Sequence, residues 1–439
     1  MESRYCRSNR ERPVSLGALV TALLLSLSLW ASASAQGVFE RPVRIGVILP
    51  PAAMEEVPVG EVPATVGQSA RLGAQFARDE LVHNAALLGI DVDILVEGAE
   101  DSEVVQVAER LVDEEGAFGL VGGFGREAAV QLSAFAAERG IPFMNIGWPG
   151  DELRNEQCSR YTFHVAPSDA MYLDALTGWF VRAGFRRWAF VYEDSDRGRD
   201  LYERTRWALE ERHFGGREVA RTRVSAQDPD WEAALKRLRS GEPEVVLALL
   251  DPRQQLEFLA RSSEAGDTWQ VTGFPHPETQ TRSYYEAWVQ SAPNDENLYR
   301  GSGWEATIDA YGARELNARF RQEMGTPMDV GSWAAYQGVR ILYDSAIAAR
   351  RLDGQALLEY MSSPAAVYDV WKGIGVSFRP WDHQLRQSLF LVHLARGEGE
   401  LPQVTLVGEL PALYLPRTDP LERLDQLGDL EAQSECDFG

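Results

Sequence analysis

The feature that most constrains the fold is a regular alternation of apolar runs with segments of helical periodicity. Residues 41–49 contain the run Val-Arg-Ile-Gly-Val-Ile-Leu, which two prolines end, and such a run is typical of a buried strand. Residues 67–83 follow with alanines at helical spacing. Short connections between such units favour a parallel sheet with helices on both faces. Further strands are predicted at 90–96, 117–121 and 141–146, and further helices at 102–114 and 126–139.

The same alternation restarts after Pro167-Ser168-Asp169 and predicts a second α/β unit. A weak strand is predicted at 161–165, just before this restart. The second unit's strands are predicted at 188–192, 217–224, 245–250 and 269–273, and its helices at 170–183, 198–212, 231–238 and 254–265. The last third is too mixed for a third domain, so we expect its segments to complete the first two. Strands are predicted there at 298–303, 376–378, 388–394 and 403–407, and helices at 308–321, 331–352 and 357–361.

The first 35 residues have the pattern of an export signal. Four arginines precede an apolar run from Val14 to Trp30, and Ala31-Ser32-Ala33-Ser34-Ala35 supplies an A-x-A cleavage site. The alternative is a single membrane anchor, but the run is near the short limit for a span and no stop-transfer pattern follows. We therefore expect a periplasmic protein that is not inserted in the membrane after cleavage.

The charge balance excludes several classes of partner. The chain has 43 Lys+Arg against 66 Asp+Glu, a formal net charge of −23. Nucleic acids and anionic lipid surfaces both select basic proteins, so we expect neither as a partner. The acidic tail from Pro416 to Gly439 is turn-rich, and alone it would be disordered.

The predicted export determines which bonds the cysteines can form. Cys6 lies in the predicted signal, which leaves Cys158 and Cys436 in an oxidising compartment. They can form one disulfide that ties the C-terminus to the body of the protein, or remain as two free thiols. Two cysteines without suitably spaced histidines make no zinc site, and we expect no metal and no cofactor.

Candidate binding residues follow the predicted strands. Ligands of open α/β sheets lie outside the carboxyl ends of the strands, and there the sequence places Gly123, Phe124, Gly125 and Arg126. The glycines permit close backbone approach to an anion, although the segment also fits a tight turn with no ligand. The other strand ends carry Trp148, Arg197, Asp251 and His276. Each of these alone can be a helix cap or a loop residue, so it is their coincidence at one edge that indicates a binding site.

Known catalytic motifs are missing from the sequence. The six histidines form no H-E-x-x-H pattern, and there is no G-x-S-x-G elbow. Acidic pairs that could serve a glycosidase are expected by chance in a chain with 66 carboxylates. We expect a binding protein rather than an enzyme.

The exported chain, its first strand and its two α/β units resemble the type I periplasmic binding proteins, in particular the Leu/Ile/Val-binding-like branch of ABC transporter substrate-binding proteins. The resemblance covers residues 41 to 408. More specific stretches are similar to a subgroup associated with pyrroloquinoline-quinone-dependent alcohol oxidation. These are Gly303-Trp304-Glu305, Gly312-Ala313-Arg314-Glu315-Leu316-Asn317, Trp333-Ala334-Ala335-Tyr336 and Phe378-Arg379-Pro380-Trp381-Asp382-His383-Gln384-Leu385-Arg386-Gln387.

The resemblance implies two Rossmann-like lobes with parallel-sheet cores and three hinge crossings, near Pro167, at 301–304 and at 371–375. The implied division is a signal at 1–35, lobe 1 at 36–166 plus 304–371, lobe 2 at 167–303 plus 372–410, and a C-terminal tail at 411–439. Trp304, at the second crossing, joins the candidate binding residues.

The resemblance also implies capture of a small molecule by closure of the cleft and delivery to an ABC permease. Family members that bind amino acids use a hydroxyl after the third strand, a tyrosine in lobe 2 and an acidic group further on. Here Arg126, Arg197 and His276 stand near those positions, which favours an anionic or aromatic ligand. The alternative is a sensor or scaffold that signals to a receptor or a dehydrogenase partner without transport.

Overall fold

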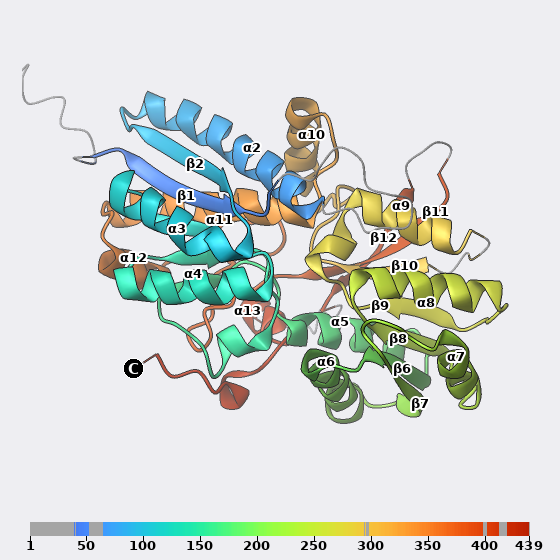
Figure 1. Ribbon diagram of the computed structural model, residues 1–439. Helices are drawn as coiled ribbons and strands as arrows, with labels where there is room; N and C mark the ends of the chain where they lie inside the picture. The colour runs from blue at the N-terminus through green and yellow to red at the C-terminus, as the bar shows by residue number, and fades with distance from the viewer. Residues whose placement is uncertain are drawn as a thin grey trace, which may run out of the picture.

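The structure is a computed structural model that describes residue 39 and residues 41–51, 65–293, 295, 298–397, 402–411 and 419–438. The segment predicted as a signal lies outside the described residues. Two α/β lobes lie beside each other, with the first lobe in blue, teal and orange and the second in green, yellow and red (Figure 1). The predicted fold class is confirmed.

The first lobe contains a five-stranded parallel sheet in the order β2-β1-β3-β4-β5. Val47 of β1 pairs with Val96 of β2 and Val121 of β3, so the central strand is apolar and buried on both sides. The strands are β1 (Val43–Leu49), β2 (Val92–Gly98), β3 (Gly119–Gly122), β4 (Phe143–Asn145) and β5 (Thr162–His164).

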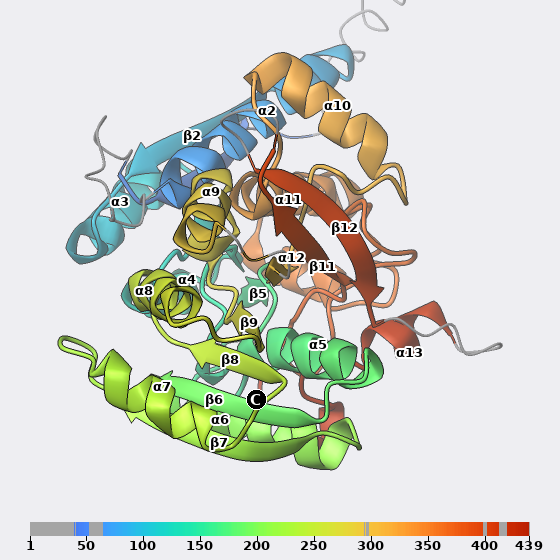
Figure 2. The ribbon, with the colours of Figure 1, turned by 90° about the vertical axis from the view of Figure 1, so that its right-hand side faces the viewer.

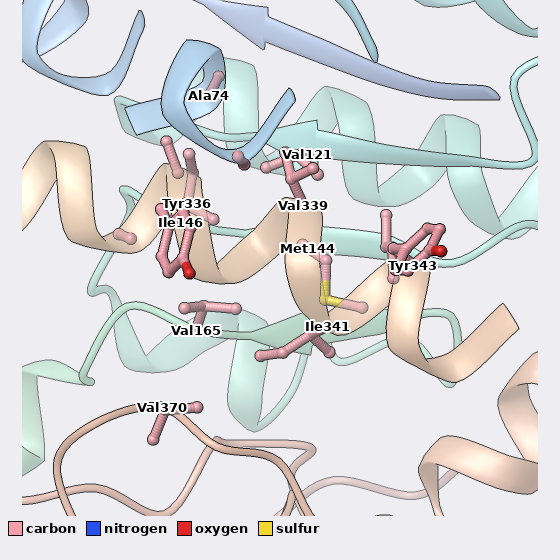
Figure 3. Packing of buried hydrophobic residues seen from close by; sticks show 14 of the residues in the cluster. Ala74, Val121, Met144, Ile146, Val165, Tyr336, Val339, Ile341, Tyr343 and Val370 are labelled. Atoms are coloured by element: carbon pink, nitrogen blue, oxygen red, sulfur yellow. The ribbon is translucent and has the colours of Figure 1, made fainter. Parts of the chain in front are cut away.

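Helices cover both faces of this sheet. One face packs on α2 (Val66–Leu87) and α11 (Val330–Ala349), and the other on α3 (Val104–Glu109) and α4 (Arg126–Arg139). Helix α11 comes from the last third of the chain, and Figure 3 shows its Val339 and Ile341 near Val121 and Met144 of the sheet. The helices α10 (Ala313–Met324) and α12 (Gly354–Met361) also belong to this lobe.

Helices α2 and α11 approach each other closely because Gly73 has no side chain. A Cβ at this position would lie 2.0 Å from the carbonyl oxygen of Ser332. No side chain can be accommodated at that separation, so the glycine sets the distance between the two helices.

The second lobe contains a four-stranded parallel sheet in the order β7-β6-β8-β9. An antiparallel sheet of β10, β11 and β12 lies beside β9 (Figure 2). The strands are β6 (Arg187–Glu193), β7 (Arg217–Val224), β8 (Val245–Leu249), β9 (Gln270–Gly273), β10 (Leu298–Ser302), β11 (Leu389–Ala395) and β12 (Gln403–Leu410). The helices are α5 (Asp169–Arg182), α6 (Asp196–Trp207), α7 (Trp231–Arg239), α8 (Pro252–Glu264) and α9 (Arg282–Ser291).

The segment that joins β5 to α5 runs beside residues 383–384. The backbone N–H of His164 donates to the carbonyl of His383 at 2.9 Å. The side chain of Gln384 donates to the carbonyls of His164 and Ala166 and accepts from Arg154 at 2.7 Å. The stretch from Phe378 to Gln387, singled out in the sequence, therefore holds the hinge segments together.

Three sequence predictions differ from the structure. Helix α9 was not predicted, because its aromatic residues have low helix propensity and obscure the helical spacing. The helix predicted at 308–321 begins at Ala313, because Tyr311 and Gly312 have φ values of 54° and 79° that no α-helix contains. The strand predicted at 376–378 is two isolated bridges, from Val376 to Tyr368 and from Phe378 to Leu385.

The C-terminal tail is ordered where it is described. It contains α13 (Pro420–Leu424) and a 3₁₀ turn at Glu431–Gln433. Asp425 accepts from Arg379 at 3.1 Å and from Arg386 at 2.8 Å. The structure pairs Cys158 with Cys436 as a disulfide, with Cα atoms 5.7 Å apart. The tail therefore binds the crossing segment at one end and lobe 1 at the other.

Candidate interlobe binding site

Arg197 is the centre of the site because it contacts residues of both lobes. It lies in the first turn of α6, where Ser195 caps the helix by accepting from Gly198. Its guanidinium forms two hydrogen bonds to Asp169, at 2.7 and 2.9 Å, and lies 4.3 Å from the ring centroid of Trp148. Burial lowers the pKa of Arg197, but the Asp169 carboxylate outweighs it and the net pKa is raised. The cation is therefore held at the junction of the lobes.

Trp148 is fixed by its own strand end. The side chain of Asn145 donates to the Trp148 carbonyl at 2.8 Å and accepts from its N–H at 3.0 Å. The indole N–H donates to Glu152 at 3.0 Å, and Arg126 donates to the same carboxylate oxygen, also at 3.0 Å. Glu152 thus connects two of the predicted site residues, and one face of the indole is presented to Arg197.

The glycine-rich turn forms part of the cleft wall. Gly123 and Gly125 have φ values of 88° and 85°, which favour glycine, and α4 begins at the next residue. Phe124 is buried, and a Cβ at Gly147 would lie 2.6 Å from its ring. The turn therefore places an aromatic side chain, rather than a hydroxyl, at the end of the third strand.

His276 and Asp251 follow neighbouring strands of the second lobe. Burial and the Arg197 charge lower the pKa of His276 to about 3, so the imidazole is neutral. Its Nε2 lies 3.1 Å from the Leu250 carbonyl, to which it donates. Asp251 accepts from the N–H groups of Arg253 and Gln254, at 2.8 and 3.1 Å, and so caps α8.

Trp304 lies behind the cleft wall. Its indole is fully buried, stacks on Trp333 at 5.7 Å and donates to Asn317 at 3.1 Å. Trp333 itself lines the cleft. Lys372 also contacts Trp333. Its Nζ lies 3.7 Å from the Trp333 ring centroid and donates to the Gly303 carbonyl at 2.6 Å. Burial holds the pKa of Lys372 well below its ordinary value.

A small hollow of about 10 Å³ remains between the lobes. Both lobes line it, and the aromatic and amide side chains in its wall are Phe124, Tyr172, Gln280 and Trp333. Gln280 donates to the Tyr172 hydroxyl at 3.0 Å and to the Pro275 carbonyl at 2.7 Å. Thr65 and Ser283 form a further contact between the lobes at 2.8 Å. This volume is that of about one water molecule, so the cleft is closed around these side chains.

A second cation lies beneath the lobe 2 wall. Arg300 is fully buried and its Nε and Nη1 have no hydrogen-bond partner among the described residues. The only side-chain oxygen that it donates to in that part of the chain is the Gln255 amide, at 3.1 Å. The charge of Arg300 also lowers the pKa of His276. Within the described residues Arg300 is thus a buried cation without a carboxylate partner, whereas Arg197 is paired with Asp169.

The sequence missed several residues of the site. Asp169, Glu152, Tyr172, Gln280 and Trp333 hold or line the cleft, yet none ends a predicted strand. Asp169 follows Pro167 and Ser168 at the start of a predicted helix, where a carboxylate is usually explained by the helix dipole. Only the fold brings it to Arg197, which lies 28 residues further on.

The described residues contain neither a candidate metal site nor a candidate membrane span. No group of three His, Cys, Asp or Glu side chains there could hold a metal ion. Across the same ranges, no helix has the length and apolar character needed to cross a membrane.

Two parallel sheets whose carboxyl edges face a common cleft, closed by an arginine and a tryptophan from opposite lobes, define a two-lobed α/β binding protein. The chain belongs to the periplasmic binding protein family, whose sequence profile matches residues 42–399. No curated protein matches the sequence at a significant level.

Solved structures show the same fold at low sequence identity. A branched-chain amino acid ABC transporter ligand-binding protein from Burkholderia xenovorans LB400 is similar with a TM-score of 0.73 and 15% identity, over 90% of this chain and 99% of that one. A solute-binding protein from Rhodopseudomonas palustris BisB5, in complex with 3,4-dihydroxybenzoic acid, has a TM-score of 0.65 and 17% identity over 85% and 99%. A solute-binding protein from R. palustris in complex with benzoate has a TM-score of 0.65 and 16% identity over 90% and 99%.

Proposed function

We propose that the protein is the periplasmic solute-binding component of an ABC importer and that it captures a small aromatic carboxylate between its lobes. The observation that carries the proposal is the position of Arg197, which stacks on Trp148 of one lobe and holds a carboxylate, Asp169, beside it. Family membership supports binding of a solute and delivery to a permease. Two similar structures hold benzoate and 3,4-dihydroxybenzoic acid.

In this proposal the ligand replaces an internal contact. In the closed structure the carboxylate of Asp169 accepts two hydrogen bonds from the guanidinium of Arg197. A ligand carboxylate takes that place by displacing Asp169, which belongs to the same lobe as Arg197. The ligand ring then lies among Trp148, Phe124 and Phe274. Phe274 is already 5.9 Å from the Arg197 guanidinium. The buried charge of Arg300 adds attraction for an anion, and the neutral His276 offers a ring nitrogen for a hydroxyl on the ligand.

A panel of ligands tests this proposal. Residues 36–439 are melted with benzoate, 3,4-dihydroxybenzoate, leucine, short aliphatic carboxylates and pyrroloquinoline quinone. A ligand at 100 times its Kd adds about 2.7 kcal/mol of stability, which raises the Tm by several degrees. We expect shifts with the aromatic carboxylates and none with leucine. Arg197→Met abolishes the shift, whereas Arg199→Met, on the exposed side of the same helix, leaves it unchanged. A shift with leucine alone would contradict the proposal.

The second candidate function is a sensor or scaffold, and one observation favours it. The hollow of about 10 Å³ and the stacking of Arg197 on Trp148 describe a cleft that closes on its own side chains. A protein with this property can present its closed surface to a receptor or dehydrogenase partner without a ligand. Folded protein that responds to no ligand in the panel would favour this function.

The finer features of the sequence prediction are also proposals. We propose export by cleavage after Ala35, a Cys158–Cys436 disulfide formed in the periplasm, and the division into lobes at 167, 303 and 371 predicted above. The disulfide is supported by the pairing of the two cysteines in the structure. A link to pyrroloquinoline-quinone-dependent alcohol oxidation rests on sequence stretches alone. Within those stretches Gln384 and Arg379 make hinge and tail contacts, so they do not specify a ligand.

A further inference from the structure

A second and much larger hollow lies on lobe 2, away from the interlobe cleft. It has a volume of about 490 Å³ and is bounded by α5, by the π-helical turn Ala208–Arg212 with the two residues after it, and by residues 410–411 and 426–430. Small-molecule sites generally have volumes of about 300–1,000 Å³. The hollow is therefore large enough for a ligand, unlike the closed cleft.

Two nitrogen-bearing side chains converge beside Gly178 in the wall of this hollow. A Cβ at Gly178 would lie 3.1 Å from Nε2 of His213 and 3.3 Å from Nη2 of Arg182. Both nitrogens thus lie next to one point, and the glycine leaves that point free of a side chain. Nε2 of His213 is buried and has no hydrogen-bond partner among the described residues. Buried polar atoms are rarely left in this state, because it costs free energy.

Positively charged side chains outnumber negatively charged ones in the lining of the hollow. Asp174, at its inner side, is fully occupied, since it accepts from Arg204, from Arg212 at 2.6 Å and from the Gly428 N–H at 2.9 Å. Arg182 has no ion pair within the described part of the chain, and its Nε donates only to the Gly178 carbonyl at 3.1 Å. A protein with a net charge of −23 therefore presents an uncompensated guanidinium here.

Much of the remaining wall is apolar, apart from Gln426 and Arg212. Val181, Leu410 and Leu427 are buried against the hollow, and Phe214 and Leu430 lie at its edge with exposed fractions of 79% and 45%. Single exposed apolar side chains are ordinary at a protein surface, but here two of them edge the same hollow. A cationic point and an apolar wall in one hollow match an amphipathic anion.

We propose that this hollow is a second binding site, for a small aliphatic carboxylate. The carboxylate accepts from the Arg182 guanidinium and from Nε2 of His213, and its negative charge favours the proton on that nitrogen. The aliphatic chain lies along Leu410 and Leu427 toward Phe214. The site is separate from the cleft and does not depend on what the cleft binds.

Titration calorimetry with sodium octanoate tests the proposal on residues 36–439, with benzoate present in excess. We expect one octanoate per chain. Arg182→Gln removes the charge-assisted hydrogen bonds and weakens binding at least tenfold, and His213→Gln weakens it independently. Arg206→Gln is the control, because Arg206 is an exposed residue of α6 whose one ion pair among the described residues is with Glu210. Circular dichroism confirms that each variant is folded.

The outcomes separate this site from the cleft. Octanoate binding that survives in Arg197→Met but is lost in Arg182→Gln supports the second site. Octanoate binding that is lost in Arg197→Met and kept in Arg182→Gln places the ligand in the cleft and overturns the proposal. Wild-type protein that takes up no octanoate at millimolar concentration overturns it as well, whether or not benzoate binds.

Discussion

Replacing Asp169 with asparagine separates the pairing of Arg197 with Asp169 from the reception of a ligand carboxylate that we propose for Arg197. The side chain of Asp169 is 6% exposed and accepts two hydrogen bonds from Arg197. Asparagine keeps the shape and one acceptor oxygen but loses the charge. Hydrogen bonds to charged groups contribute about 1.5–3 kcal/mol each.

Two features reduce the loss of stability. Burial and the charge of Asp169 both raise the pKa of Asp151, and asparagine removes that repulsion. Arg197 also keeps 29% of its side chain exposed, so water partly solvates the cation that is released. We therefore expect Asp169→Asn to lower the free energy of unfolding by about 1–2 kcal/mol. Benzoate no longer competes with an internal carboxylate, so its affinity rises about tenfold, or 1.4 kcal/mol.

Urea unfolding and titration calorimetry measure the two effects on the same sample. Asp196→Asn is the matched control, because Asp196 lies in the first turn of α6 with its side chain 93% exposed, and its one ion pair in the described part of the chain is with Arg199. It should change neither quantity. A folded Asp169→Asn protein that binds benzoate as weakly as the wild type, or more weakly, would refute the idea that Asp169 and the ligand compete for Arg197.

Three further predictions concern stability. Lys372→Met removes a buried amine whose pKa in the folded protein lies below its unfolded value of about 10.4. The stability of the wild type therefore rises as the pH increases between those two pKa values. Thermal melting from pH 7 to 10 should show this rise for the wild type and not for the variant. Gly73→Ala forces a Cβ to within 2.0 Å of the Ser332 carbonyl oxygen and should lower the free energy of unfolding, measured in urea, by about 3 kcal/mol or more. Gly408→Ala is the control, because its Cβ would meet nothing nearer than 3.7 Å, and it should lower that free energy by less than about 1 kcal/mol. Cys436→Ser should lower stability by about 2–5 kcal/mol and open the tail to limited proteolysis, and an unchanged melting curve would show that the disulfide is absent from the folded protein.

The alternation of strands and helices in the sequence predicted most of the fold, because the sheet residues are buried on both faces and are therefore apolar. Strand β8, with five apolar residues in succession, and helix α4, which ends at Gly140, were predicted within a residue or two. Helix α9 was missed because Tyr284, Tyr285 and Trp288 suggest a strand when their packing is unknown. The assignment of α11 to the first lobe followed from the resemblance, and the packing of Gly73 on Ser332 gives its physical basis.

The site was predictable only where a residue directly follows a strand. Arg197 and Trp148 were singled out for this reason, and the structure brings them to 4.3 Å from each other. The same rule selected Asp251, which caps a helix, because a capping carboxylate and a binding carboxylate look alike in sequence. Asp169 could not be found in this way, since its pairing with Arg197 is set by how α5 packs against α6 and not by any local pattern.

The central claim is that Arg197 receives the carboxylate of an aromatic ligand between the lobes. Titration calorimetry of benzoate into residues 36–439, for the wild type and for Arg197→Met, tests it most directly. The account predicts saturable binding of one benzoate per chain by the wild type and at least a tenfold loss of affinity in Arg197→Met. Equal affinity in the two proteins, or no binding to a folded wild type, would contradict it.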